Sequence, residues 1–358
     1  MSHHEERLAA DLGAIRACLE TVSAEVMQAV QNAVQVLLTG DRDLAARTIL
    51  GDMHINRSTR EVDRRCHAFV ARHFPSAGVL RFISSALRMD VALERVGDYA
   101  ATICRETLQL KEPLSQTIIR DVEMMSDLSL QLLEAGLRSF NQEDAELAHR
   151  TIALAAHTKN QFNKALRDLI DEGQQGRRPI RDLFELLLIF IRFERVRAQA
   201  KNICEETVFC VEGKTKQPKN YRILFLDRKN DGRSQLAEAF ARKAYPESGV
   251  YSSAGFEPAE KLDPRFVDFM DRHGLSLGAA VPIRFDPRPS VLEQFHVIVG
   301  LEAGALEQIG ELPYSTIFLN WEGEPIGDCS DESLEAAYKQ LTPRVRDLIE
   351  ALRGEGAS

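Results

Sequence analysis

The sequence predicts a multi-domain protein in which an all-α region of two tandem three-helix bundles precedes an α/β domain with a parallel sheet. Three observations predict this fold class. The first 212 residues carry long helical patterns and almost no strand signal, blocks of that region recur about 100 residues later, and short apolar runs alternate with helical stretches after residue 220. At 358 residues the chain is long enough for two domains that each bury a core.

The helical region spans residues 1–212 and is divided by breaks that contain glycine, proline or polar residues. Apolar residues recur at helical spacing, as in Val26, Val30 and Val34. The breaks fall near residues 40–41, 74–75, 111–113, 141–143 and 173–179. This pattern predicts six helices, most of them long.

The six predicted helices form two copies of three. The segment Leu44–Ile49 returns as Leu147–Ile152, at an offset of 103 residues, and Glu94–Thr107 returns as Glu194–Thr207, at an offset of 100. Two matched blocks at nearly the same offset indicate a tandem duplication of a three-helix bundle. The two repeats are expected at about 10–111 and 112–212.

The second domain is expected at 221–358, after a polar, basic, proline-containing linker at 213–220. A first strand, a glycine-containing turn and a helix over 234–245 open this domain. The strand candidates are 221–226, 250–253, 296–301 and 315–319. Because helical stretches separate these runs, the sequence predicts a parallel sheet.

Composition excludes several classes of protein. A net charge of −9 gives no electrostatic reason to bind nucleic acid or an acidic membrane surface. The N-terminus has no apolar signal-peptide core, and the most apolar stretch, 183–193, is too short and too charged to span a bilayer. The six cysteines show no metal-ligand spacing and suit a reducing compartment. We therefore expect a cytoplasmic protein without membrane insertion.

An acidic stripe marks the first repeat. Three carboxylates lie at i, i+4 and i+8 on one face of the predicted third helix. The second helix carries a pair of residues at i and i+4 whose side chains also carry oxygen ligands. The residues of this stripe are Asp90, Glu94 and Asp98, with Asp52 and Asn56. Like charges at this spacing destabilise a helix unless a partner offsets them, and a hard cation is one such partner. The alternative is a solvated acidic face that Arg88 and Arg95 neutralise.

Residues 89–103 and 51–63 resemble the aspartate-containing signatures of the PhoU family, and the duplicated three-helix bundle is the architecture of that family. The resemblance covers about residues 10–212. It implies a homodimeric regulator that restrains phosphate uptake and phosphate-starvation signalling, with a phosphate ABC transporter and a phosphate-sensing histidine kinase as partners. It also implies iron or another divalent cation on the acidic residues of the first repeat.

The second repeat departs from this pattern. Ala155, Phe190 and Ala198 stand where the first repeat has Asp52, Asp90 and Asp98, and only Glu194 keeps its carboxylate. A methyl group offers no lone pair to a metal. Metal binding is therefore expected on the first repeat alone.

The second domain opens with a strand, a short loop and a helix, an arrangement that binds anions. Backbone N–H groups converge at the helix N-terminus, and an arginine there adds a bidentate fork for a tetrahedral oxyanion. The candidate loop residues are Asp227, Asn230, Gly232, Arg233 and Ser234.

This loop resembles that of the low-molecular-weight protein tyrosine phosphatases, especially their arsenate-reductase branch, and the resemblance covers about residues 221–352. The family carries a nucleophilic cysteine that five residues separate from the Arg-Ser pair, and here Asp227 stands at that position. An aspartate cannot form the thiophosphate intermediate. The expected acid loop also departs, since Cys329 rather than proline follows Asp328.

The sequence therefore predicts a pseudo-phosphatase domain that serves as a docking or anion-sensing module. We expect Asp227 to fill the anion site, to pair with Arg233 and to have a depressed pKa. Two alternatives stay open at this stage. One is an enzyme with residual phosphatase or arsenate reductase activity, and the other is a dimeric scaffold that binds neither metal nor anion.

Overall fold

The computed structural model describes residues 3–156, 159–215, 220–277, 280–324, 326–327 and 329–354. The chain divides into two compact units, Met1–Lys216 and Gln217–Ser358, and the boundary falls inside the predicted linker. The first unit is helical and the second combines helices with a sheet, so the predicted fold class is confirmed. No helix among the described residues is both long and apolar enough to cross a bilayer.

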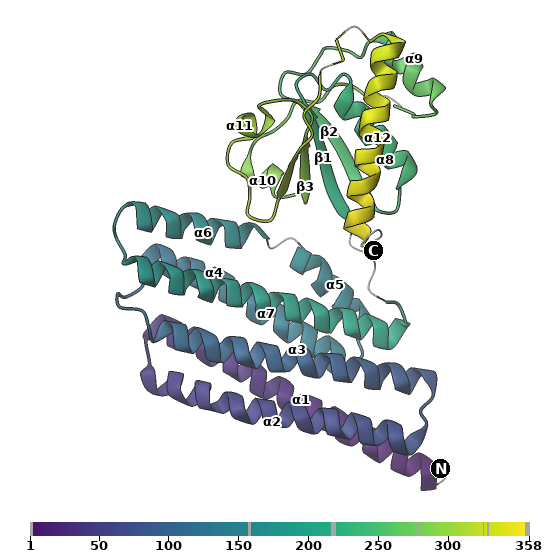
Figure 1. Ribbon diagram of the computed structural model, residues 1–358. Coiled ribbons are helices and arrows are strands. Elements are labelled where there is room, and N and C mark those ends of the chain that lie inside the picture. Colours follow the sequence, from purple (N-terminus) through teal and green to yellow (C-terminus); the bar gives the residue numbers. More distant parts are fainter. Residues whose placement is uncertain are drawn as a thin grey trace. The chain divides into compact units, whose positions relative to one another are not determined.

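Long helices build the first unit (Figure 1). They are α1 (His3–Thr39), α2 (Arg42–His73), α3 (Ala77–Thr107), α4 (Gln116–Asn141), α5 (Ala145–Ala156), α6 (Lys159–Gln174) and α7 (Ile180–Glu212). The duplication is visible at the helix starts. The carboxylate of Asp41 caps α2 by accepting from the Leu44 N–H at 2.9 Å, and that of Asp144 accepts from the Leu147 N–H at 2.8 Å.

The middle helix of the second repeat is described in two parts. The segment equivalent to α2 comprises α5, which ends at Ala156, and α6, which begins at Lys159. Residues 157 and 158, between these two parts, lie outside the described residues. The expectation of one helix in this segment therefore stays a prediction.

The third helices of the two repeats pack against each other at the centre of the unit. Buried apolar side chains from both repeats form one continuous core around them, including Leu93 and Val96 of α3 and Phe193 and Val196 of α7. An ion pair between Arg88 and Glu206, 2.7 Å apart, joins α3 to α7 at the edge of this core.

A buried charged cluster near the α6–α7 turn holds the segment that connects α3 to α4. The Arg178 guanidinium pairs with the Glu172 carboxylate at 3.0 Å and lies 3.7 Å from that of Asp182. Arg178 also donates to the carbonyl oxygens of Glu112 and Pro113, in the segment between α3 and α4. The Asp182 carboxylate accepts from the backbone N–H groups of Lys111 and Glu112. All three charged side chains are buried, so this cluster fixes the connection between the repeats.

The second unit is built on a four-stranded parallel sheet with the strand order β2-β1-β3-β4. The strands are β1 (Tyr221–Asp227), β2 (Gly249–Gly255), β3 (Val297–Gly300) and β4 (Ile317–Asn320). The helices are α8 (Arg233–Ala244), α9 (Pro264–Arg272), α10 (Pro289–Leu292), α11 (Ala305–Ile309) and α12 (Asp331–Arg353). Each strand overlaps one of the four predicted runs.

Helices cover both faces of this sheet (Figure 1). Because side chains alternate along a strand, Ile223 and Phe225 point to the core shared with α8, α9 and α12, while Leu224 and Leu226 point to the core shared with α10 and α11. Burial on both faces explains the uninterrupted apolar run of β1. This run ends at Asp227, at the carboxyl edge of the sheet, where open α/β sheets bind ligands.

Candidate functional site

The loop between β1 and α8 encloses the Asp227 carboxylate. One carboxylate oxygen accepts from the Asn230 N–H at 2.5 Å, and the other accepts from the Ser234 N–H at 2.8 Å. Asp227 is buried, and Ser234 lies in the first turn of α8. The carboxylate therefore occupies the anion-binding position that the N–H groups at this helix start create.

Side chains inside the loop hold its shape. Asn230 is fully buried and has a φ of 52°, in the left-handed region that asparagine tolerates. Its amide donates to the Ser234 hydroxyl at 2.9 Å, and its oxygen accepts from the Gln235 side chain and from the Ile283 N–H. These contacts make Asn230 the internal brace of the loop, so it is a structural member of the predicted site.

Glycines at two positions let neighbouring segments approach the loop. A Cβ atom on Gly255, at the end of β2, would lie 2.7 Å from the Asn230 N atom and 2.8 Å from the Lys229 carbonyl carbon. A Cβ atom on Gly232 would lie 3.2 Å from Ile326. Gly255 is therefore required for β2 to support the loop, because the backbone atoms that it faces cannot rotate away.

Arg233 does not behave as predicted. Within the described ranges no ion pair joins it to Asp227. Its guanidinium instead donates to the Gln340 side chain at 2.9 Å and to the Glu324 carbonyl at 3.4 Å. A Cβ on Gly323 would collide with this guanidinium, which lies against the Gly323 backbone. The arginine is thus held by α12 and the segment before it, so the predicted Asp227–Arg233 ion pair is wrong.

The pKa of Asp227 also departs from the prediction. Burial raises this pKa above its ordinary value, although the hydrogen bonds from Ser234 and Asn230 act in the opposite direction. Glu302, just after β3, is half-buried beside it, and burial together with the Asp227 charge raises the pKa of Glu302 too. The expectation of a depressed Asp227 pKa overlooked the loss of hydration of this buried carboxylate.

A cavity of about 560 Å³ opens beside this loop and carries charges of both signs. The acidic residues that line it are Asp227, Asp231, Asp263 and Glu302, and the basic ones are Arg228, Lys229, Arg233 and Lys261. A phosphate dianion in this cavity would meet like charge from the carboxylates and opposite charge from the cationic side chains.

Two other sequence expectations concern the rim of the cavity. Asp328, the expected acid, lies outside the described residues. Cys329 lines the cavity and has a backbone φ of 47°, a left-handed conformation that is uncommon for residues other than glycine, asparagine and aspartate.

The sequence did not predict the role of Gln340, because no local pattern marks a residue that lies 107 positions from its partner Arg233.

The predicted acidic stripe lies on α2 and α3. Asp52 and Asn56 are on α2, and each has a buried side-chain oxygen with no hydrogen-bond partner among the described residues. The two helices approach closely here, since a Cβ on Gly97 would lie 3.1 Å from Ile55 and 3.6 Å from an Asp52 oxygen. Orphaned oxygens of this kind are what a hard cation binds.

Burial and neighbouring carboxylates raise the pKa values of two residues of the stripe. Burial and the charges of Asp98 and Glu94 raise the pKa of Asp52. Burial, with the charges of Asp63 and Glu94, raises the pKa of Asp90 to about 7. In the part of the chain that the structure describes, no three acidic, histidine or cysteine side chains converge closely enough to hold a metal ion. The donor chemistry fits a cation, but the side chains do not close around one point.

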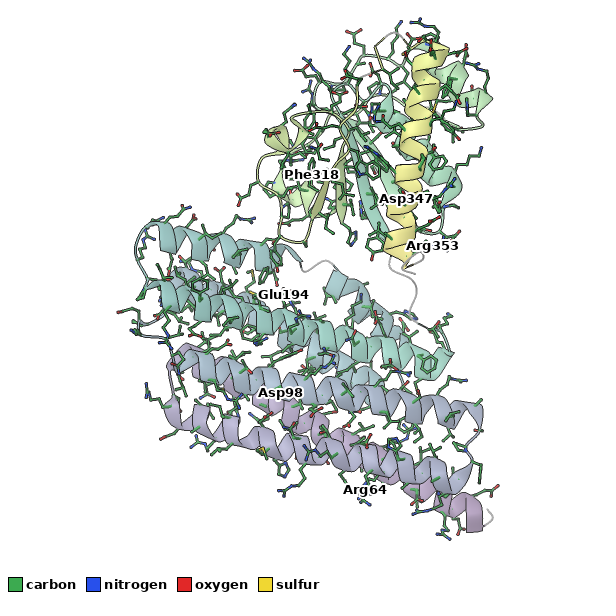
Figure 2. The ribbon with its side chains drawn as sticks, viewed as in Figure 1. Arg64, Asp98, Glu194, Phe318, Asp347 and Arg353 are labelled. Atoms are coloured by element: carbon green, nitrogen blue, oxygen red, sulfur yellow. The ribbon has the colours of Figure 1, made fainter. Side chains whose placement is uncertain are left out.

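The second repeat has a positively charged side chain at a position equivalent to one within the acidic stripe of the first repeat. Arg197 stands where the first repeat has Gly97, and it is buried. It forms an ion pair with Glu194 and donates to the Gln161 side chain at 3.1 Å, while burial lowers its pKa to about 10. Figure 2 shows Glu194 on α7 and Asp98 on α3. The only carboxylate that the second repeat keeps from the stripe is therefore already paired.

Two family models match the chain. A model described as "PhoU domain" matches residues 19–107 and 122–207, and one described as "Low molecular weight phosphotyrosine protein phosphatase" matches residues 222–356. The first match falls on the two helical repeats and the second on the α/β unit. Residues 227–234, which form the loop, lie near the start of the second match.

Relatives of known sequence and structure match the helical unit. The phosphate-specific transport system accessory protein PhoU of Escherichia coli is 27% identical over 211 residues, 59% of this chain and 88% of that protein. A Pseudomonas aeruginosa homologue is 28% identical over 215 residues, 60% of this chain and 89% of that protein. The crystal structure of PhoU from Pseudomonas aeruginosa is 28% identical, with a TM-score of 0.56 over 57% of this chain and 99% of that chain.

Proposed function

We propose that this chain, in which a PhoU domain precedes a low-molecular-weight phosphatase-like domain, is a cytoplasmic regulator that restrains phosphate uptake and phosphate-starvation signalling. The observation that carries the proposal is the similarity of both helical repeats to phosphate-specific transport accessory proteins. In this proposal a homodimer contacts a phosphate ABC transporter and a phosphate-sensing histidine kinase. The α/β domain serves as a docking module rather than as an enzyme.

The test of the regulatory function is a reporter of the phosphate-starvation response in the host organism. Deleting the chain should make the reporter active even in phosphate-rich medium, and the full chain supplied in trans should restore repression. A deletion strain that represses the reporter normally would contradict the proposal. Arsenate-dependent expression in place of phosphate-dependent expression would favour the enzymatic alternative.

The proposed absence of catalysis rests on Asp227. A phosphatase of this fold needs a thiolate that attacks phosphorus, and the loop N–H groups must stabilise the anion as it forms. Here a carboxylate already accepts from the Asn230 and Ser234 N–H groups, and Glu302 adds a second negative charge nearby.

We therefore expect no turnover of para-nitrophenyl phosphate and no reduction of arsenate by the wild-type chain. The measurement is the rate of each reaction over the buffer blank, with the Asp227→Ala variant as the control for contaminating activity. Restoring a thiol in Asp227→Cys should yield at most weak turnover, because Arg233 is held by Gln340. A wild-type rate that disappears in Asp227→Ala would show that Asp227 is catalytic.

Metal binding on the first repeat is a second part of the proposal. Asp52, Asn56, Glu94 and Asp98 would hold iron or another divalent cation through oxygen atoms, with Asp90 at the buried end of the stripe. The orphaned oxygens of Asp52 and Asn56 support this assignment. Burial is the main cause of the raised Asp52 pKa, and the cation would offset the additional effect of the Asp98 and Glu94 charges.

Asp98→Ala reproduces in the first repeat what the second repeat has at Ala198. We expect this variant to lose the metal that the purified wild-type chain carries, as measured by plasma mass spectrometry, while its stability changes by less than about 0.5 kcal/mol because Asp98 is exposed. Glu194→Gln in the second repeat is the matched control and should keep the metal. Loss of metal from the Glu194→Gln variant alone would show that the site lies in the second repeat and that its assignment to the first repeat is wrong.

A further inference from the structure

A polar cavity lies between α3 and α7, at the interface between the two repeats. It encloses about 220 Å³. Drug-sized ligands occupy cavities of about 300–1,000 Å³, so this cavity suits a smaller molecule. No residue of the acidic stripe lines it, which separates it from the metal site proposed above. Its lining includes Ala92 and the polar residues Arg88, Arg95, Gln199, Asn202, Glu205 and Glu206.

The duplication provides an internal comparison for this cavity. The helices α3 and α7 run antiparallel, since Arg88 of α3 pairs with Glu206 of α7, and Arg192 of α7 lies 4.0 Å from Glu106 of α3. Because the two helices correspond at an offset of 100 residues, each position along their interface has a counterpart. At the counterpart of the cavity, Arg192 stands where the cavity has Ala92.

The side chain of Arg192 fills that counterpart position. Its guanidinium carbon lies 6.0 Å from the ring centroid of Tyr99, and one of its nitrogens lies 4.0 Å from the Glu106 carboxylate. Tyr99 and Glu106 correspond to Gln199 and Glu206, and both of these residues line the cavity. The cavity is therefore the space that an arginine side chain occupies in the duplicate, and a free molecule of about that size would fit it.

Two amide side chains in the lining leave one donor and one acceptor unused. The Asn202 amide nitrogen donates to the Gln199 amide oxygen at 3.2 Å. Among the described residues, no other hydrogen bond involves the side chain of Gln199 or Asn202. Exchanging oxygen and nitrogen in both amides leaves the same need for one acceptor and one donor. Gln199 is only 7% exposed, so a ligand in the cavity would satisfy an amide that water reaches poorly.

The charged side chains of the lining leave the same two needs. One Glu206 oxygen pairs with Arg88 at 2.7 Å, and the other is buried without a hydrogen-bond partner in the described ranges. Glu205 pairs with Lys201 at 3.5 Å. Arg95 is exposed and, within the same ranges, forms neither an ion pair nor a side-chain hydrogen bond. The cavity thus offers a cation to a carboxylate and a carboxylate oxygen to an ammonium group.

We propose that the α3–α7 cavity binds a small amino acid zwitterion, with its carboxylate at Arg95 and its ammonium group at Glu206. The charged lining consists of two cations and two anions, so a ligand with one charge of each sign leaves the site neutral. An ion of a single sign would leave a net charge in a partly buried site, which is unfavourable. The proposal goes beyond the regulatory function proposed above and does not depend on it.

Isothermal titration calorimetry of the purified full-length chain tests this proposal with two probes, γ-aminobutyrate and L-leucine, which differ in the separation of their charges. We expect at least one of them to bind with a dissociation constant on the order of 100 μM. The matched analogues without the ammonium group are butyrate and isocaproate, and those without the carboxylate are propylamine and isoamylamine. Each analogue should bind at least about tenfold more weakly than its parent, because one buried polar group stays unsatisfied.

Two variants test the position of the site. Arg95→Ala removes the unpaired cation, and Ala92→Arg fills the cavity as Arg192 fills its counterpart, so each should weaken binding at least about tenfold. Arg195→Ala is the matched control, since Arg195 is the exposed counterpart of Arg95 and does not line the cavity. This control should bind as the wild type does. Circular dichroism confirms that each variant is folded, and Arg95→Ala alone suffices if Ala92→Arg unfolds.

Three results would overturn the proposal. The first is the absence of binding of both amino acids to the wild type, including the case in which inorganic phosphate binds instead and is lost in Arg95→Ala. The second is equal binding by the wild type and a folded Arg95→Ala variant. The third is an analogue with a single charge that binds as tightly as its parent. All of these measurements use the purified chain, so their outcome is independent of the reporter assay for the regulatory function.

Discussion

Arg178→Ala should lower the free energy of unfolding of the helical unit by about 3–5 kcal/mol, which is the usual effect of removing one partner from a buried ion pair. The substitution would leave the buried Glu172 and Asp182 carboxylates without their cation. It would also free the carbonyl oxygens of Glu112 and Pro113, which Arg178 holds between the repeats. The measurement is a urea titration of the full chain, followed by the helical circular dichroism signal.

Arg177→Ala is the control for this experiment, because Arg177 is the exposed neighbour of Arg178 and its loss should change stability by less than about 0.5 kcal/mol. The free energy of unfolding of Arg178→Lys should lie between those of the two alanine variants, since lysine keeps the charge but lacks the planar guanidinium that donates several hydrogen bonds. An Arg178→Ala variant within about 1 kcal/mol of the wild type would show that the cluster does not hold the repeats together.

Inorganic phosphate should stabilise the second unit of an Asp227→Ala variant and leave that of the wild type unchanged. The substitution exposes the Asn230 and Ser234 N–H groups that the carboxylate occupies, and it removes a negative charge from the cavity. A bound oxyanion can then accept from the same donors. At about a hundred times its dissociation constant, phosphate would add about 2.7 kcal/mol.

Trp321 makes this prediction measurable in the full chain. It is the only tryptophan of the sequence and packs near Phe225 of β1, so its fluorescence reports on the second unit alone. Asp231→Ala is the control, because Asp231 also lines the cavity. Its loss leaves Asp227 in place, and phosphate should have no effect on that variant. Equal stabilisation of wild type and Asp227→Ala would show that Asp227 does not occupy the anion site.

The parts of the structure that depend on nearby residues were predictable from the sequence. The apolar run of β1, the turn after Asp227 and the helix that follows predict a strand, a loop and a helix start that bring N–H groups to one point. The position of the Asp227 carboxylate in that loop follows, since its partners Asn230 and Ser234 are three and seven residues away. The duplication predicted both the number of repeats and the difference between their acidic residues.

The parts that depend on distant residues were not predictable. The partner of Arg233 comes from α12, and the Gly323 backbone that contacts its guanidinium belongs to the segment before that helix. The exposed apolar side chains of α6 and α7 were missed for a different reason, because apolar residues at helical spacing indicate a buried face equally well. Phe184 of α7, for example, is 62% exposed.

The carboxylate of Asp227 also has a consequence for the abundance of the protein in the cell. A domain whose loop needs bound phosphate loses that stabilisation when the phosphate concentration falls, and its unfolded fraction is then open to proteolysis. In this chain the group that accepts the loop's hydrogen bonds is the carboxylate of Asp227, which belongs to the chain itself, so its effective concentration does not change with the phosphate concentration in the cell. We expect the lifetime of the protein to be the same in starved and phosphate-rich cells, which is compatible with the regulatory role proposed above.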